Sequence, residues 1–264
     1  MPGQETSMTP SISVGKRGAL HVEIRSVPLR QPLKWLSRGW EDVKEIGKPG
    51  LAHGALIAIL GAVLLMLGST HLYLTAAAVT GYLLVGPVMT TGLCELARRR
   101  EAHERLGFDE SLQALTRNPE GLMNFAGVLA LVAVLWFVFS AVVLETALNA
   151  SVPSLTVALW GGSAGSLRMA QMLGYIGSGA VLAALVFSMS VVAVPLMIDR
   201  HASASDAIRA SARASFANLP AMLLWSALIV AVTAIGFVTL LVGMVVVAPL
   251  LGYATWHAYR DLIA

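Results

Sequence analysis

Four titratable side chains lie near the ends of the long apolar segments of this chain: His53, Glu95, Asp199 and His257. If those segments cross a membrane, a charge inside it costs about 2.5–3.5 kcal/mol on insertion scales, so such a residue is a candidate functional group. All four lie within a few helical turns of a segment end, where water and lipid headgroups can solvate them. We therefore treat them as candidate functional polar groups at one face, for which anchoring at the membrane surface is the simpler role.

Two kinds of chemistry can be tested against these residues. His53, Glu95 and His257 are ligand types that suit zinc or iron, but no two of them are three or four residues apart on one helix. Ser178 and His257 could suggest an intramembrane serine protease, but Ile176 stands where the rhomboid motif Gly-x-Ser-Gly has its first glycine. The two side chains would also differ by on the order of 10 Å in depth, too far for a nucleophile and its base. We predict no catalytic residue, no metal and no cofactor.

The apolar segments that would hold these groups indicate a membrane protein. Of the 264 residues, 56% are hydrophobic and only 12% are charged, about half the charge of a typical soluble domain. The runs 121–144, 169–198 and 214–256 contain no Lys, Arg, Asp, Glu or His, and about 18 such residues are enough to cross a bilayer. The polar segments between them are too short for a separate catalytic domain.

We predict an all-α, polytopic membrane protein with six transmembrane helices. The final apolar stretch, 219–258, is about twice as long as one crossing needs, so we expect two helices there with a tight turn near Gly236–Gly243. Residues 1–32 are expected to form a disordered cytoplasmic tail, and residues 33–264 the membrane domain. The expected spans are about 51–69, 72–97, 121–147, 171–198, 219–238 and 241–258.

The distribution of positive charge predicts the orientation of these spans. All Lys and Arg residues except Arg168 lie in 1–50, 98–120, 199–218 and the last few residues. Because basic loops stay on the cytoplasmic side, we expect both termini to be cytoplasmic. The basic residues are mixed with acidic ones and lie beside the spans, so contact with the lipid bilayer and its anionic headgroups is the simpler account, and no nucleic acid is expected.

Three polar segments, 33–46, 108–118 and 203–219, resemble one another. Each has an apolar stripe at helical spacing beside basic residues, which is typical of a helix lying in the headgroup layer. Each is followed by a proline that suits a bend from a lying to a spanning helix, and Ser203 and Asp206 have the spacing of a capping box. The stripes are Leu33, Leu36, Trp40 and Val43; Phe108, Leu112 and Leu115; and Ile208, Ala212, Phe216 and Leu219; the prolines are Pro49, Pro119 and Pro220.

The second, fourth and sixth spans also share a pattern. Each contains a proline that is a candidate helix break, and each ends at an arginine. These pairs are Pro87 with Arg98, Pro195 with Arg200, and Pro249 with Arg260. We therefore predict three pseudo-repeats, 33–100, 108–200 and 203–260. Each begins with an interfacial amphipathic helix, which precedes a helical hairpin of two spans.

Three stretches together resemble a known family: Tyr82-Leu-Leu-Val-Gly-Pro87 to Arg100, Phe187 to Arg200, and Pro249 to Asp261. They are similar to the bacterial integral membrane proteins called domain of unknown function twenty-one eighty-nine, over about residues 35–264. The resemblance implies a six-span protein of the bacterial inner (cytoplasmic) membrane. The family has no established activity, so the resemblance assigns no role to any residue.

Two functions from different classes remain as expectations. The first is a non-enzymatic accessory or scaffolding component of the membrane, because titratable groups inside the spans are nearly absent. Its partner would be another membrane protein or a second copy of the chain. The alternative is a transporter of small solutes or lipids, with a cavity lined by the proline-bearing spans 2, 4 and 6. A polar cavity that reaches mid-depth would favour the transporter, and a packed interior would favour the scaffold.

Overall fold

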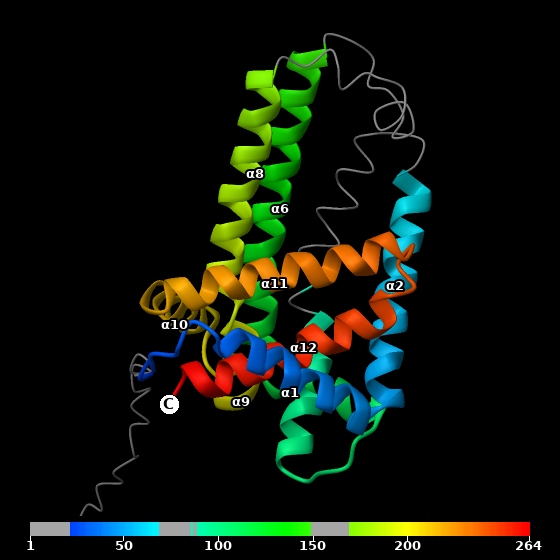
Figure 1. Cartoon of the computed structure of the whole chain (residues 1–264), viewed down its shortest axis with the longest axis vertical. Helices are drawn as coiled ribbons and strands as arrows, with labels where there is room; N and C mark the ends of the chain where they lie inside the picture. The colour runs from blue at the N-terminus through cyan, green and yellow to red at the C-terminus, as the bar shows by residue number, and fades with distance from the viewer. Residues whose placement is uncertain (1–21, 69–85, 87–88, 149–168) are drawn as a thin grey trace, which may run out of the picture.

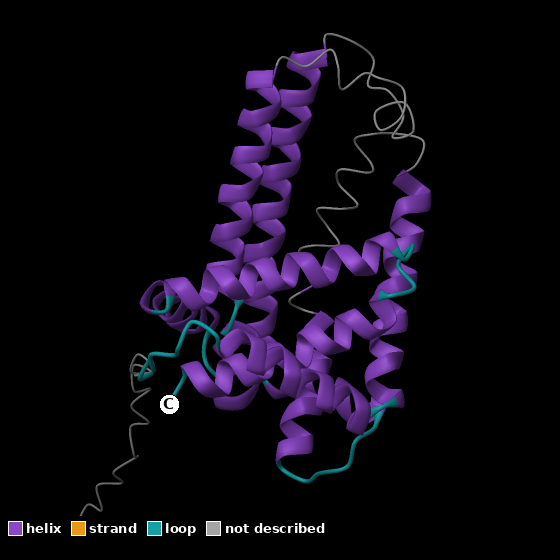
Figure 2. Cartoon of the chain, viewed as in Figure 1, coloured by secondary structure: helices purple, strands orange, loops and turns teal. Residues whose placement is uncertain are grey.

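The computed structural model describes residues 22–68, 86, 89–148 and 169–264. This part of the chain is almost entirely helical, and its one β-type contact is an isolated bridge between Ile24 and Ile263 (Figure 2). The prediction of an all-α protein is therefore confirmed. Two long helices, α6 (Pro119–Leu148) and α8 (Met169–Ser190), pack side by side and extend from a base of shorter, crossing helices (Figure 1).

The base is built around α12 (Met244–Leu262). One side of α12 packs against α1 (Gln31–Ile46) and another against α2 (Lys48–Gly68). The helical segment 89–101 also contacts α12, where a Cβ atom on Gly252 would lie 2.7 Å from Leu93. Only glycine permits this approach, so α12 is in close contact with protein around Gly252.

The three predicted amphipathic segments are helical. They form α1, the pair α4 (Phe108–Leu112) and α5 (Ala114–Arg117), and α10 (Ala204–Ala217). Of the bends predicted from the prolines, the one at Pro49 is present, because α1 meets α2 at 107°. A single residue, Asn218, separates α10 from α11 (Leu219–Val238). At the start of α10 the Ser203 hydroxyl accepts the Asp206 N–H, as expected of its N-cap.

The most deeply buried residues of the amphipathic helices lie beside the predicted apolar stripes, of which only some members, such as Leu36, Val43 and Ile208, are partly buried against the core. In α1, Trp35 and Gly39 are buried, whereas Trp40 of the stripe is 44% exposed. In α10 a row of alanines and serines is buried, whereas Phe216 of the stripe is 72% exposed. Small residues let these helices approach their neighbours closely, and the bulky apolar side chains remain on the outside.

Three helices of the described part are long and apolar enough to cross a membrane, and a fourth is added if α1 and α2 form one bent span. The three are Pro119–Ser140, Leu173–Arg200 and Leu219–Val238. Six spans are thus not confirmed: most of predicted span 2 lies outside the described residues, and α12 carries too many polar groups in its second half. In Figure 1, moreover, α11 runs across the molecule rather than along α6 and α8.

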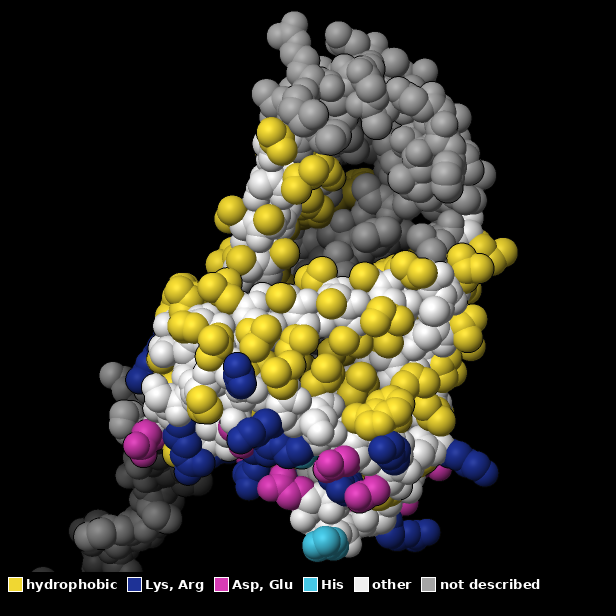
Figure 3. Space-filling model, viewed as in Figure 1, with side chains coloured by type: hydrophobic (Ala, Val, Ile, Leu, Met, Phe, Trp, Pro, Cys, Tyr) yellow, Lys and Arg dark blue, Asp and Glu magenta, His cyan; other side chains and the backbone are white. Residues whose placement is uncertain are grey.

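Side-chain types separate along the long axis of the molecule. Figure 3 shows the Lys and Arg side chains gathered across the lower part of one face, below a broad apolar surface. The apolar stretch 219–258 forms two helices with a turn between Val238 and Met244, as predicted. The polar base and the apolar upper part are the arrangement expected of an integral membrane protein.

The predicted tail and the predicted helix breaks are placed only in part. Residues 1–21 lie outside the described residues, but the Arg25 N–H donates to the Leu262 carbonyl at 2.9 Å, so the segment that follows is tied to the C-terminus. Pro195 is the third residue of α9 (Ala193–Arg200), just after the end of α8. Pro249 lies inside α12, which continues on both sides of it. Pro87 lies outside the described residues.

Candidate functional site

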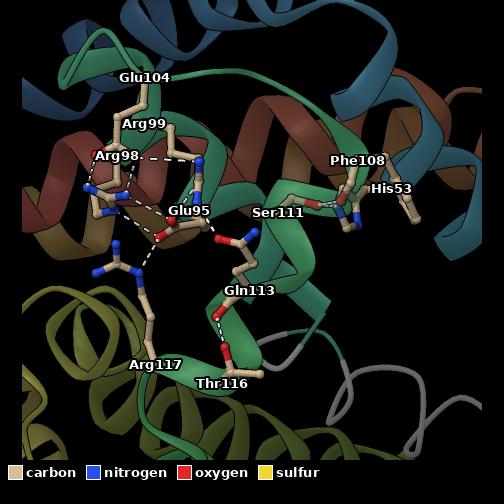
Figure 4. A network of polar contacts seen from close by, with 10 residues as sticks. All are labelled: His53, Glu95, Arg98, Arg99, Glu104, Phe108, Ser111, Gln113, Thr116 and Arg117. Atoms are coloured by element: carbon tan, nitrogen blue, oxygen red, sulfur yellow. Dashed lines mark hydrogen bonds and ion pairs between the residues drawn. The ribbon is translucent and has the colours of Figure 1, made fainter.

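The carboxylate of Glu95 is fully buried at the base and is surrounded by arginines (Figure 4). It accepts hydrogen bonds from the Nε and Nη2 atoms of Arg98 and from Nε of Arg99, each at 2.9 Å. Arg117 of α5 adds an ion pair at 3.2 Å. Arg98 and Arg99 follow Glu95 by three and four residues on one helix, so helical geometry brings their side chains together. Glu95 thereby joins the helical segment 89–101 to α5.

A second layer of polar groups surrounds the arginines. Arg98 also donates to Glu104 at 2.9 and 3.0 Å, and Arg99 donates to Gln113 at 2.8 Å. The hydrogen bond from Arg98 lowers the pKa of Glu104 below its ordinary value. Each guanidinium therefore has an acceptor, as a charge removed from water requires. Figure 4 shows Glu104 and Gln113 on different sides of this group of arginines.

His53 of α2 makes a separate contact, with Ser111 of α4. Their Nε2 and Oγ atoms are 2.6 Å apart, and the ring lies 4.8 Å from that of Phe108, centroid to centroid (Figure 4). The Ser111 hydroxyl donates to the Phe108 carbonyl, so it accepts from His53. A Cβ atom on Gly92 would lie 2.6 Å from the imidazole. Since Ser111 is fully buried and its proton is directed away from the histidine, the pair fastens two helices and is not arranged as a nucleophile with its base.

His257 of α12 contacts a carboxylate that the sequence did not single out. Its Nε2 atom donates to Asp42 of α1 at 3.0 Å, and Arg100 pairs with the other oxygen of Asp42. The Asp42 side chain is fully buried. It therefore connects α1, α12 and the helical segment 89–101 at a single point.

Three more carboxylates of the base also join separate helices. Tyr259 of α12 donates to Asp199 of α9 at 2.5 Å. Trp256 of α12 donates to Glu101 at 2.9 Å. Asp261 accepts from Trp35 at 2.7 Å and pairs with Arg38, which binds the end of α12 to α1. These three contacts extend the same arrangement around the base.

The structure therefore places the four predicted polar groups, His53, Glu95, Asp199 and His257, in four separate contacts. Within the described residues, no group of three His, Cys, Asp or Glu side chains is placed to hold a metal ion. The Ser178 hydroxyl donates to the Tyr175 carbonyl at 2.8 Å, within α8, whereas His257 is bound to Asp42. Among the described residues, these contacts connect helices to one another.

Asp42 was missed for a reason that the sequence contains. Trp35, Gly39, Asp42 and Ile46 follow one another at spacings of four, three and four, which is a helical face as regular as the apolar stripe. An aspartate makes that face less hydrophobic than the neighbouring apolar stripe, so hydrophobic periodicity predicts that the stripe is the packing face. An acidic residue flanked at helical spacing by tryptophan and glycine is a signal that could have identified the packing face.

Comparison with family models supports the resemblance that the sequence suggests. Residues 74–199 match the family described as Predicted integral membrane protein (DUF2189). The match includes Pro87 to Arg100 and Phe187 to Asp199, but not the stretch from Pro249 to Asp261. Comparison with curated proteins gave no match, and comparison with solved structures gave none either. Over residues 74–199, the chain is thus similar to integral membrane proteins of this family.

Proposed function

We propose that this protein is a non-enzymatic accessory or scaffolding component of the bacterial inner membrane. The proposal rests on one observation: the buried charged side chains of this protein bind to other helices of the same chain. The side chains of Glu95 and Asp42 are fully buried, and each of them joins separate helices. An enzyme or an ion-coupled transporter keeps such groups at an accessible site. Here they are used to hold the base together.

The contacts among helices support a closed arrangement of three units, which are the predicted repeats 33–100, 108–200 and 203–260. α10, which opens the third unit, packs on α8 and α9 of the second, and α4, which opens the second unit, packs on α2 of the first. α1, which opens the first unit, packs on α12 at the end of the third. Each amphipathic helix thus lies against the unit that precedes it, counted cyclically. A ring of this kind suits a rigid platform.

Two equivalent asparagines support the same arrangement. Asn118 and Asn218 each stand just before the first long helix of a unit. The Asn118 amide donates to the carbonyl of Ala202 at 2.8 Å, two residues before α10. The Asn218 amide donates to the carbonyl of Arg25 at 3.0 Å, and its oxygen accepts the Val27 N–H at 2.8 Å, shortly before α1. In both units the asparagine holds the segment that leads into the next amphipathic helix.

The transporter is the second candidate. It would need a polar path beside the prolines of the second, fourth and sixth spans. Pro195 and Pro249 are both buried, and the residues next to them, Val194, Leu196 and Ala248, are apolar and buried as well. Pro87, the third proline, lies outside the described residues. We rank the scaffold first on these grounds.

The two candidates are separated by reconstitution and by partner analysis. The purified full-length protein in proteoliposomes should show no saturable uptake of solutes and no transfer of lipid between leaflets. In native membranes, cross-linking should recover a membrane-protein partner or a second copy of the chain in fixed proportion, and a partner's assembly should fail when the gene is deleted. Saturable, solute-specific uptake by the purified protein would overturn the scaffold.

The proposed orientation, with both termini and the basic segments on the cytoplasmic side, has its own test. Cysteines are introduced one at a time at Ser163, which lies outside the described residues, and at Ser203, in a chain whose Cys94 is replaced by serine. A membrane-impermeant thiol reagent added to intact cells should label position 163 and leave position 203 unlabelled until the membrane is opened. The reverse pattern would invert the topology.

A further inference from the structure

α1 presents two different faces, and only one of them is used inside the protein. Trp35 and Asp42 are fully buried on the face that packs against α12. On another face, Leu33 is 48% exposed and Trp40 is 44% exposed. These two residues are seven apart, so they lie on one side of the helix. An exposed apolar face beside basic residues is the pattern of a helix in contact with a lipid surface.

A shallow depression of about 390 Å³ adjoins this apolar face. It is lined by Gln31, Lys34, Ser37, Arg38 and Asp261. Four of these five side chains carry N–H or O–H donors. Its size lies at the lower end of the range for small-molecule sites, about 300–1,000 Å³, which is enough for a phosphate with part of its glycerol.

The one carboxylate in the depression is already neutralised. Asp261 accepts hydrogen bonds from Gln31 and Trp35, each at 2.7 Å, and pairs with Arg38. Lys34 is exposed and forms no ion pair with any residue that the structure describes. The free positive charge of the depression is therefore that of Lys34, next to the hydroxyl of Ser37.

A second cation marks the boundary between the apolar face and water. The ammonium group of Lys44 lies 5.7 Å from the centre of the Trp40 ring, within the range of a cation–π contact. A tryptophan beside a lysine is typical of the headgroup layer of a membrane. This charge of α1 thus lies beside one of its exposed apolar side chains.

We propose that α1 binds an anionic phospholipid of the inner leaflet. The phosphodiester occupies the depression, where it contacts the Lys34 ammonium and the Ser37 hydroxyl, and the glycerol and upper acyl chain lie along Leu33 and Trp40. This inference rests on the proposed placement of the base at the cytoplasmic surface. It goes beyond the scaffold by naming a ligand class and its site.

The test measures binding of phosphatidylglycerol to the full-length protein in detergent by native mass spectrometry. One lysine near an anionic surface contributes about 1 kcal/mol, so Lys34→Gln should raise the apparent Kd for the first bound lipid about fivefold. Lys34→Arg should keep the affinity within about twofold. Trp40→Ala should weaken lipid binding as well, because it removes the apolar contact. The matched control is Arg105→Gln, which removes an exposed charge in the loop before α4.

The arms of the experiment separate the sources of the phosphate. Phosphatidylcholine should bind more weakly than phosphatidylglycerol, and millimolar inorganic phosphate should not displace the lipid. Equal effects of Lys34→Gln and Arg105→Gln would overturn the site, because attraction would then depend on net charge alone. Displacement by inorganic phosphate would overturn it in favour of a free-anion site. Neither result bears on uptake by proteoliposomes, so the scaffold and the lipid site can fail separately.

Discussion

The hairpin of α6 and α8 and the pair of α1 and α12 are both helix pairs, but they are held in different ways. In the hairpin, Leu131 and Leu135 of α6 are about three-fifths exposed, at 60% and 61%. The polar contact recorded between its helices is the hydrogen bond from Tyr175 to Ser140, at 3.1 Å, beside the stacked ring of Trp136. In the second pair, α12 is largely buried, and two of its polar groups, His257 and Asp261, are bound to α1.

This difference shows where the stability of the molecule is concentrated. The hairpin faces lipid, where apolar side chains gain little from leaving their surroundings and helix contacts are weak. The base buries the side chains of Glu95 and Asp42 completely, so these charges must be paired by other side chains. Substitutions in the base should therefore cost more than comparable substitutions in the hairpin.

The largest effect is expected from Glu95→Ala. It leaves Arg98, Arg99 and Arg117 without their shared buried partner, and breaking a buried ion pair costs about 3–5 kcal/mol. Thermal unfolding of the purified protein in detergent, followed by circular dichroism, measures the loss. Arg117→Gln should cost less, because Glu95 keeps two arginines. Equal stability of Glu95→Ala and the wild type would show that this cluster is dispensable.

A smaller but clear effect is expected from Gly54→Ala. The added Cβ atom would lie 2.1 Å from the Val245 carbonyl oxygen, so α2 and α12 would have to move apart. Overpacking of this kind costs about 1–3 kcal/mol. The matched hairpin variant is Gly177→Ala, where no described atom lies within 4 Å of the new Cβ. If both variants melt at the same temperature, the comparison between base and hairpin fails.

Acid should weaken the tie between α1 and the end of α12. Burial alone would raise the pKa of Asp261, but the hydrogen bonds from Arg38, Gln31 and Trp35 lower it below the ordinary value of 3.8. A carboxyl whose pKa is lowered by folding stabilises the folded state above its unfolded pKa, and this contribution disappears as the pH falls through the lowered value. Stability should therefore decline below about pH 3.8, and Asp261→Asn should show a shallower decline with a lower stability at neutral pH.

The smallest effect is expected from Tyr175→Phe in the hairpin. It removes the hydrogen bond to Ser140 and keeps the ring that stacks on Trp136. Hydrogen bonds between helices in a bilayer contribute about 0.6 kcal/mol on average. Unfolding measured as for Glu95→Ala should change only slightly. A loss as large as that of Gly54→Ala would show that the hairpin is held more firmly than its contacts suggest.

Much of the fold could be predicted from local pattern. The amphipathic helices, the bend at Pro49 and the two helices of 219–258 follow from hydrophobic periodicity and proline chemistry, which act over a few residues. The number of spans could not be obtained in this way. α12 contains an apolar run, but its surroundings are other helices of the same chain, and hydropathy does not distinguish burial in protein from burial in lipid.

By itself, the sequence determined that the chain is a helical membrane protein with its basic residues gathered at one face. Hydrophobic composition and the distribution of charge along the chain determine both properties, and neither depends on which helices pack together. Only the tertiary structure decided what the charged groups do. Glu95 meets Arg117, and Asp42 meets His257, across 22 and 215 residues of sequence respectively. Such pairs depend on which helices lie side by side, and that is decided by the packing of small residues such as Gly39 and Gly252. The same packing turned these polar groups inward, where they join helices, and left Leu33 and Trp40 of the α1 stripe exposed.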